Sequence, residues 1–158
     1  MLLDVIKKIT RVMLIFSMIL NVIMIFYHSS APPEKSKEQS SATGNQIAET
    51  VPPETTQGSF IQENLRDIAH FAEYGILAVQ AVTYIIIFSR KRALPTALAV
   101  LGGVGLAFFD EMVVQRFSGR SPDMHDVMLD TSGFVTMTLV CYLIAFLYTG
   151  LDRLVNKK

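Results

Sequence analysis

The chain has 158 residues, of which 51% are apolar and only 18% are charged, and its formal net charge is zero. Average soluble proteins carry about 25% charged residues, so this composition argues against a soluble globular domain. A nucleic-acid-binding protein would show a basic excess, so the neutral balance excludes nucleic acid as a partner. The single cysteine, Cys141, excludes an internal disulfide and a cysteine-based zinc cluster.

Four apolar segments are long enough to cross a bilayer, which takes about 17–25 helical residues. We therefore predict an all-α polytopic membrane protein, a bundle of four transmembrane helices with an extracellular polar rim. The predicted division is 1–11 as a cytoplasmic N-terminus, 12–28 as the first transmembrane helix, 29–59 as a flexible extracellular linker, 60–151 as a core with transmembrane helices at about 68–88, 93–109 and 131–151, and 152–158 as a cytoplasmic tail.

Basic residues gather on one side of the predicted spans. Nine of the 14 lie in short segments next to the membrane, namely Lys7, Lys8, Arg11, Arg90, Lys91, Arg92, Arg153, Lys157 and Lys158. The positive-inside rule makes this side cytoplasmic, so both termini are predicted to be cytoplasmic. An alternative interpretation of the start is a cleaved signal peptide, with Val12–Tyr27 as its apolar region and Ser29-Ser30-Ala31 as its cleavage site.

The segment between the first two spans is polar. Pro32–Gln57 is rich in Pro, Glu, Lys, Ser, Thr and Gln, and it has no helical or alternating apolar period. This composition is typical of flexible segments. Ser59-x-x-Gln62 matches a capping box, so we predict that a continuous helix from Phe60 to Ser89 follows it.

Polar residues recur at the outer ends of the second and third spans. Ionisable groups at membrane depth are costly and usually mark function or a buried pair. Arg66, His70 and Glu73 follow at i, i+4 and i+7, which places them on one helical face. The third span ends in Asp110-Glu111, and Gln115 lies one turn beyond Glu111.

The fourth helix is predicted to begin at Ser121-Pro122, with Ser as the N-cap and Pro in the first turn. Asp123, Asp126 and Asp130 then share one face, and Arg120 lies just before the helix, where it can pair with one of them. A helix N-terminus favours carboxylates, which accounts for Asp123 and can extend to Asp126. It does not account for Asp130, which lies two turns into the helix.

These residues are predicted to meet in one functional pocket at the outer face. The predicted set is Arg66, His70, Glu73, Asp110, Glu111, Gln115, Arg120, Asp126 and Asp130. Each has a structural explanation as well: His70 as an interfacial histidine paired with Glu73, and Asp110-Glu111 as a solvated helix end. The Gly102-Gly103-x-Gly105 run is explained by close packing of membrane helices rather than by a phosphate-binding loop.

An ordered set of motifs runs through the spans. It comprises Arg66-x-x-x-His70-Phe71-x-Glu73-Tyr74-x-x-Leu77, Asp110-Glu111, Gln115, Phe117, Gly119-Arg120 and Asp126-Val-x-x-Asp130-x-x-Gly133, together with Tyr27-His28-Ser29-Ser30. This combination resembles the VanZ-like family and makes 60–151 a VanZ-like core. Four positions depart from the family pattern: Asp67 replaces a common Lys, Gln115 and Phe117 come one position late, and Ser118 replaces the usual Pro. The resemblance implies a multi-pass protein of the bacterial plasma membrane linked to resistance against glycopeptides, teicoplanin above all.

Three classes of function remain open. The first is a non-enzymatic envelope protein whose rim binds a lipoglycopeptide or a lipid-linked envelope ligand. The second is a membrane enzyme in which His70 acts as general base, Glu73 orients it, and carboxylates act as acids or hold Mg²⁺ or Ca²⁺. The third is a structural protein whose charges fix helix packing while its partners act. Membrane lipids are the predicted partners, with no resident metal or cofactor, and the oligomeric state stays open.

Overall fold

The computed structural model describes residues 1–52 and 54–155, whose regular structure is helical without a strand. The long apolar helices are α1 (Leu2–Ser29), α4 (Leu65–Phe88), α5 (Ala93–Phe109) and α7 (Met124–Val155). α5 continues into a π-helix, η1 (Asp110–Val114), and the short α6 (Gln115–Phe117). Four segments of the described chain can cross a membrane by length and composition: Leu2–Ser29, Leu65–Phe88, Ala93–Phe117 and Met124–Arg153. The predicted all-α fold with four transmembrane helices is confirmed.

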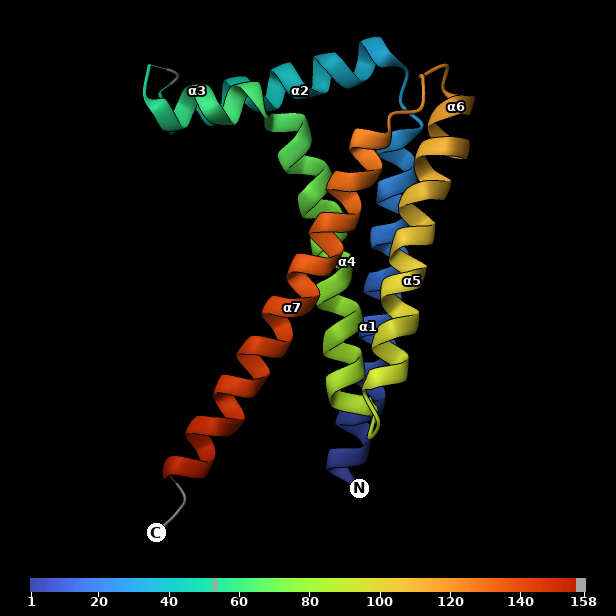
Figure 1. Cartoon of the computed structure of the whole chain (residues 1–158), viewed down its shortest axis with the longest axis vertical. Helices are drawn as coiled ribbons and strands as arrows, with labels where there is room; N and C mark the ends of the chain where they lie inside the picture. Colours follow the sequence, from blue (N-terminus) through green and yellow to red (C-terminus); the bar gives the residue numbers. More distant parts are fainter. Residues whose placement is uncertain (53, 156–158) are drawn as a thin grey trace.

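The membrane helices pack around α4, which contacts α1, α5 and α7. α1, α4 and α5 run side by side, whereas α7 crosses α4 and diverges from the bundle toward its C-terminal end (Figure 1). The two termini lie at one end of the molecule, and α2 (Pro33–Ala48) lies across the other end (Figure 1). The ends of α1, α4 and α7 that carry the basic segments therefore face the same way.

The apolar core joins all four membrane helices. Its buried members include Ile25 of α1, Tyr74 of α4, Ala107 of α5 and Phe134 of α7. The outward faces of the helices remain apolar and exposed, among them Phe16, Ile19, Leu101, Leu143, Phe146 and Tyr148. Large exposed apolar surfaces mark contact with a membrane or a protein partner, and the length of these helices favours lipid.

Two glycines allow the helices to pack closely. A Cβ added at Gly133 of α7 would overlap the backbone carbonyl of Phe71 in α4, so these two helices touch backbone to backbone. A Cβ at Gly103 of α5 would lie 2.7 Å from the ring of Phe134. Gly102 and Gly105 have open space at the same position. Within the predicted glycine run, close packing therefore depends on Gly103.

The segment 29–59 differs from its predicted flexible linker. It contains α2 and the first half of α3 (Thr56–Glu63), so the expectation of irregular structure is wrong for these residues. Pro32 is the N-cap of α2, Pro33 occupies its first turn, and Glu34 adds an acid there, which are favourable N-terminal signals. α2 has no apolar period because it is a polar helix, and this is why a search for amphipathic spacing misses it.

Two predicted helix starts are also wrong. The side chain of Thr55, not Ser59, caps α3 by accepting a hydrogen bond from the Gly58 N–H at 3.0 Å. The predicted continuous helix breaks at Asn64, after which α4 begins. α7 begins at Met124 rather than at Ser121-Pro122, and the Asp123 carboxylate accepts the His125 N–H at 2.8 Å. α7 also extends into the predicted tail 152–158, of which residues 156–158 lie outside the described part.

Candidate functional site

A pocket of about 460 Å³ opens between α2 and the ends of α1 and α4, at the end of the bundle opposite the termini. Its lining comprises His28 and Ser29 of α1, Ser36, Ser40, Ala42, Thr43 and Gln46 of α2, Leu65, Arg66, Ala69, His70 and Glu73 of α4, and Arg120 of the loop before α7. The other five predicted site residues lie in the protein behind it and are almost completely buried: Asp110, Glu111, Gln115, Asp126 and Asp130.

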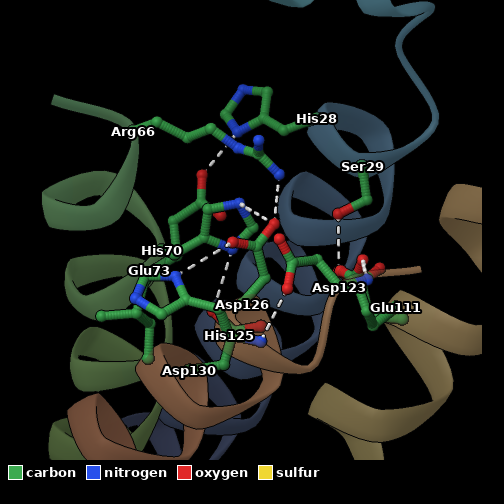
Figure 2. A network of polar contacts seen from close by, with 12 residues as sticks. His28, Ser29, Arg66, His70, Glu73, Glu111, Asp123, His125, Asp126 and Asp130 are labelled. Carbon is green, nitrogen blue, oxygen red and sulfur yellow. Dashed lines mark hydrogen bonds and ion pairs between the residues drawn. The ribbon is translucent and has the colours of Figure 1, made fainter. Parts of the chain in front are cut away.

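Asp126 and Asp130 of α7 hold the basic residues of α4. The Nδ1 atom of His70 lies 3.0 Å from Asp130 Oδ1, and its Nε2 atom lies 3.8 Å from Asp126 Oδ2. Arg66 forms an ion pair with that same Asp126 oxygen. Figure 2 shows Arg66 and His70 converging on Asp126 from one helix. The buried carboxylates of α7 thus orient both pocket-lining groups.

Glu73 has a different partner from the one expected. Instead of pairing with His70, its carboxylate lies 2.6 Å from Nδ1 of His28 in α1 (Figure 2). His28 is a pocket residue that the site prediction omitted. The Tyr27-His28-Ser29-Ser30 motif was its only signal in the sequence, because pairing between residues this far apart depends on how α1 packs against α4.

Asp110, Glu111 and Gln115 form an inner layer within η1 and the start of α6. The Ser29 hydroxyl donates to Asp110 Oδ2 at 2.6 Å. Glu111 accepts from the Gln115 amide and, at 2.6 Å, from the backbone N–H of Asp123. The alternative of a solvated helix end is wrong for Asp110-Glu111, since these residues are at most 1% exposed. Glu111 instead ties η1 to the residue just before α7.

The π turn of η1 is what turns these residues inward. A π turn holds one residue more than an α turn, which accounts for the late position of Gln115 relative to the family pattern. π turns inside α-helices are frequent at functional sites. The extra residue allows Asp110, Glu111 and Gln115 to be buried together.

Arg120 is placed in the pocket by the turn that ends α6. Gly119 has φ +79°, and the Arg120 N–H donates to the Gln115 carbonyl at 3.2 Å. This is the Schellman arrangement, which favours glycine at the left-handed position. The predicted ion pair of Arg120 does not form, because no carboxylate oxygen in the described residues lies within 4.0 Å of its guanidinium. Burial and the neighbouring Arg66 lower the pKa of Arg120.

Five buried side-chain polar atoms have no hydrogen-bond partner among the described residues: Tyr74 OH, Asp110 Oδ1, Gln115 Oε1, Asp130 Oδ2 and Thr138 Oγ1. Buried polar groups are normally hydrogen-bonded, so such a group points to a water, a shared proton or a ligand in the inner layer. Tyr74 belongs to the family motif but not to the predicted site.

A second arrangement brings potential metal ligands together at the junction of α4 and α7. One ligand atom each from Asp67, His125 and Asp126 lies within 4.8 Å of the others. Asp126 already pairs with Arg66, and a cation there would lie against that guanidinium. The geometry therefore favours an ion-pair role for Asp126 over metal binding.

The fold and this polar layer define a class: a polytopic helical membrane protein with a polar pocket at one end of its bundle. The family model described as VanZ/LLP1 matches residues 14–146, which include all nine predicted site residues, and the chain belongs to this family. The resemblance drawn from the sequence motifs is confirmed. Neither the comparison with curated proteins nor that with solved structures gave a match.

Proposed function

We propose that this protein holds the polar head of an envelope amphiphile in its pocket, at the outer face of the bacterial plasma membrane, and thereby lowers susceptibility to lipoglycopeptides such as teicoplanin. The observation that carries the proposal is the placement of Arg66, His70 and Arg120 around one pocket at the end of the membrane helices. An amphiphile can place its head there while its acyl chain stays in the bilayer.

The charge distribution supports the outer location. The basic segments lie at the other end of the bundle, which the positive-inside rule assigns to the cytoplasm. Both termini then lie in the cytoplasm, and α2 lies on the outer surface above the pocket. The link to glycopeptides rests on the resemblance to the VanZ-like family.

Binding is favoured over acid–base catalysis by the environment of His70. Both of its ring nitrogens face carboxylates of α7, at 3.0 Å and 3.8 Å, rather than the pocket. A general base must reach the proton that it abstracts. His70 in this position helps to hold Arg66 and the wall of the pocket.

The experiment is a teicoplanin susceptibility assay in a sensitive bacterium that expresses the protein. Arg120→Gln should abolish the protection, because Arg120 lines the pocket and its guanidinium has no carboxylate within 4.0 Å among the described residues. Arg116→Gln is the matched control, since Arg116 is exposed on α6 outside the pocket lining. Membrane levels of the variants are compared by immunoblot. Equal protection by both variants would contradict a function of the pocket.

A further inference from the structure

The ionisable side chains that line the pocket are predominantly basic. His28, Arg66 and Arg120 line it, and His70 lines it with both ring nitrogens turned to the acids of α7. Glu73 is its one acidic lining residue among the described residues. The carboxylates of Asp126 and Asp130 lie behind this layer with 3% and 0% of their side chains exposed. The acids therefore orient the basic groups from inside, and the surface offered to a ligand is that of an anion site.

Arg66 and Arg120 approach this pocket from different elements, α4 and the loop after Gly119. Both line the same pocket, and burial and Arg66 lower the pKa of Arg120 while the acids Asp126, Glu111 and Asp110 raise it. Arg66 has a carboxylate partner, but Arg120 has none within 4.0 Å among the described residues. An anion between the two guanidiniums would relieve their repulsion and give Arg120 a charged partner.

The face of α2 above the pocket supplies neutral polar groups. Ser36, Ser40, Thr43 and Gln46 line the cavity, and their spacing of four, three and three residues places them on one side of the helix. A carboxylate has two oxygens in one plane, which a single guanidinium can satisfy. A phosphate has oxygens in several directions, which suits two guanidiniums on one side and hydroxyl and amide groups on another.

We propose that the pocket binds the phosphate group of a membrane lipid, held by Arg66 and Arg120 beneath the hydroxyl face of α2. This inference rests on the proposed function and names the chemistry of the amphiphile head. The cavity of about 460 Å³ exceeds what a bare phosphate needs and leaves room for a neighbouring glycerol or sugar unit. Its position at the ends of membrane helices favours a lipid-borne phosphate over a free one.

The test uses the purified full chain in dodecyl maltoside, a detergent without phosphate, and isothermal titration calorimetry. Three probes are compared: dodecyl phosphate, dodecanoate with the same chain length, and inorganic phosphate. We expect dodecyl phosphate to bind, inorganic phosphate to compete weakly for the same site, and dodecanoate to bind at least about tenfold more weakly. Equal affinities for dodecyl phosphate and dodecanoate would overturn the inference. Equal affinities for dodecyl phosphate and inorganic phosphate would overturn the claim that the phosphate belongs to a lipid.

Variants locate the binding. Arg120→Gln should weaken dodecyl phosphate binding by about tenfold or more, the range for a hydrogen bond to a charged group, while Arg116→Gln leaves it unchanged. The double variant Ser40→Ala, Thr43→Val tests the α2 face without changing charge and should weaken binding by a smaller factor. Unchanged affinity in Arg120→Gln overturns the inference.

The two proposals fail in different ways. If Arg120→Gln loses teicoplanin protection but keeps dodecyl phosphate affinity, the phosphate inference is wrong and the proposed function stands. If the variant loses dodecyl phosphate affinity but keeps full protection, phosphate binding stands and the proposed function is wrong.

Discussion

Asp126 holds two basic side chains of α4 that line the pocket, Arg66 and His70. It is 2% exposed, forms the ion pair with Arg66 and lies 3.8 Å from His70, so one buried carboxylate serves two basic groups of α4. Asp123, three residues earlier, has a local role instead, because its carboxylate accepts the His125 N–H at the start of α7. The two acids lie three residues apart but differ in what they hold.

We predict that Asp126→Asn lowers the stability of the protein by about 1.5–3 kcal/mol, since it removes a charge that accepts hydrogen bonds in a buried place. Asp123→Asn should change stability by less than about 0.5 kcal/mol, because Asn and Asp are comparable N-caps. Thermal unfolding of both variants in detergent measures the difference. Similar shifts for the two variants would show that Asp126 does not support the cluster.

At the level of single residues, the sequence indicated most of the site but not its pairing. The prediction that Arg66, His70 and the α7 acids lie together agrees with their contacts in the structure. Their functional role stays a prediction. His28 was missed, and Glu73 pairs with it while an acid of another helix holds His70, because a histidine on α1 approaches α4 only through the packing of the bundle.

Among the helices, the contact between α4 and α7 matters most for the site, since it places Arg66 and His70 beside Asp126 and Asp130. This contact depends on Gly133, where an added Cβ would overlap the Phe71 carbonyl. The backbone of α4 cannot move aside for an added methyl group, as the end of a flexible side chain could. A larger residue at this position must push α7 away from α4.

Gly133→Ala should therefore destabilise the protein by about 1–3 kcal/mol, the usual range for overpacking a close contact. Gly102→Ala is the matched control, because its Cβ enters open space and alanine is the better helix former by about 1 kcal/mol. The midpoints of thermal unfolding in detergent compare the two. A Gly133→Ala midpoint at or above that of Gly102→Ala would contradict the close packing.

The short elements were harder to predict than the membrane helices. α2 lacks apolar periodicity, and its place across the end of the bundle gives it a role in the pocket that composition does not indicate (Figure 1). The π turn of η1 depends on which residues can be buried against α1 and α7. The position of α2 and the formation of the π turn are decided by tertiary contacts rather than by local helix propensity.

For the molecule as a whole, the orientation in the membrane can be tested directly. Single cysteines are introduced at Gln46 in α2 and at Arg90 between α4 and α5, both exposed, in a Cys141→Ala background. In intact cells a membrane-impermeant maleimide should label position 46 and not position 90, because the basic segments are expected in the cytoplasm. The reverse pattern would place the pocket on the cytoplasmic side and remove the basis for an outer-face function.

The sequence alone determined the class of the protein, its four spans and the end of the bundle at which polar residues gather. These properties depend on quantities that are local in the chain: the length of apolar runs, the side on which basic residues flank them, and helical spacing. The tertiary structure decided the pairs, His28 with Glu73, Ser29 with Asp110 and Arg66 with Asp126, and it left Arg120 facing a pocket under α2. The physical reason is that each pair joins residues of different helices, so it forms only once the bundle has packed. For Arg66 and Asp126, the close approach of α7 to α4 at Gly133 brings the two helices together.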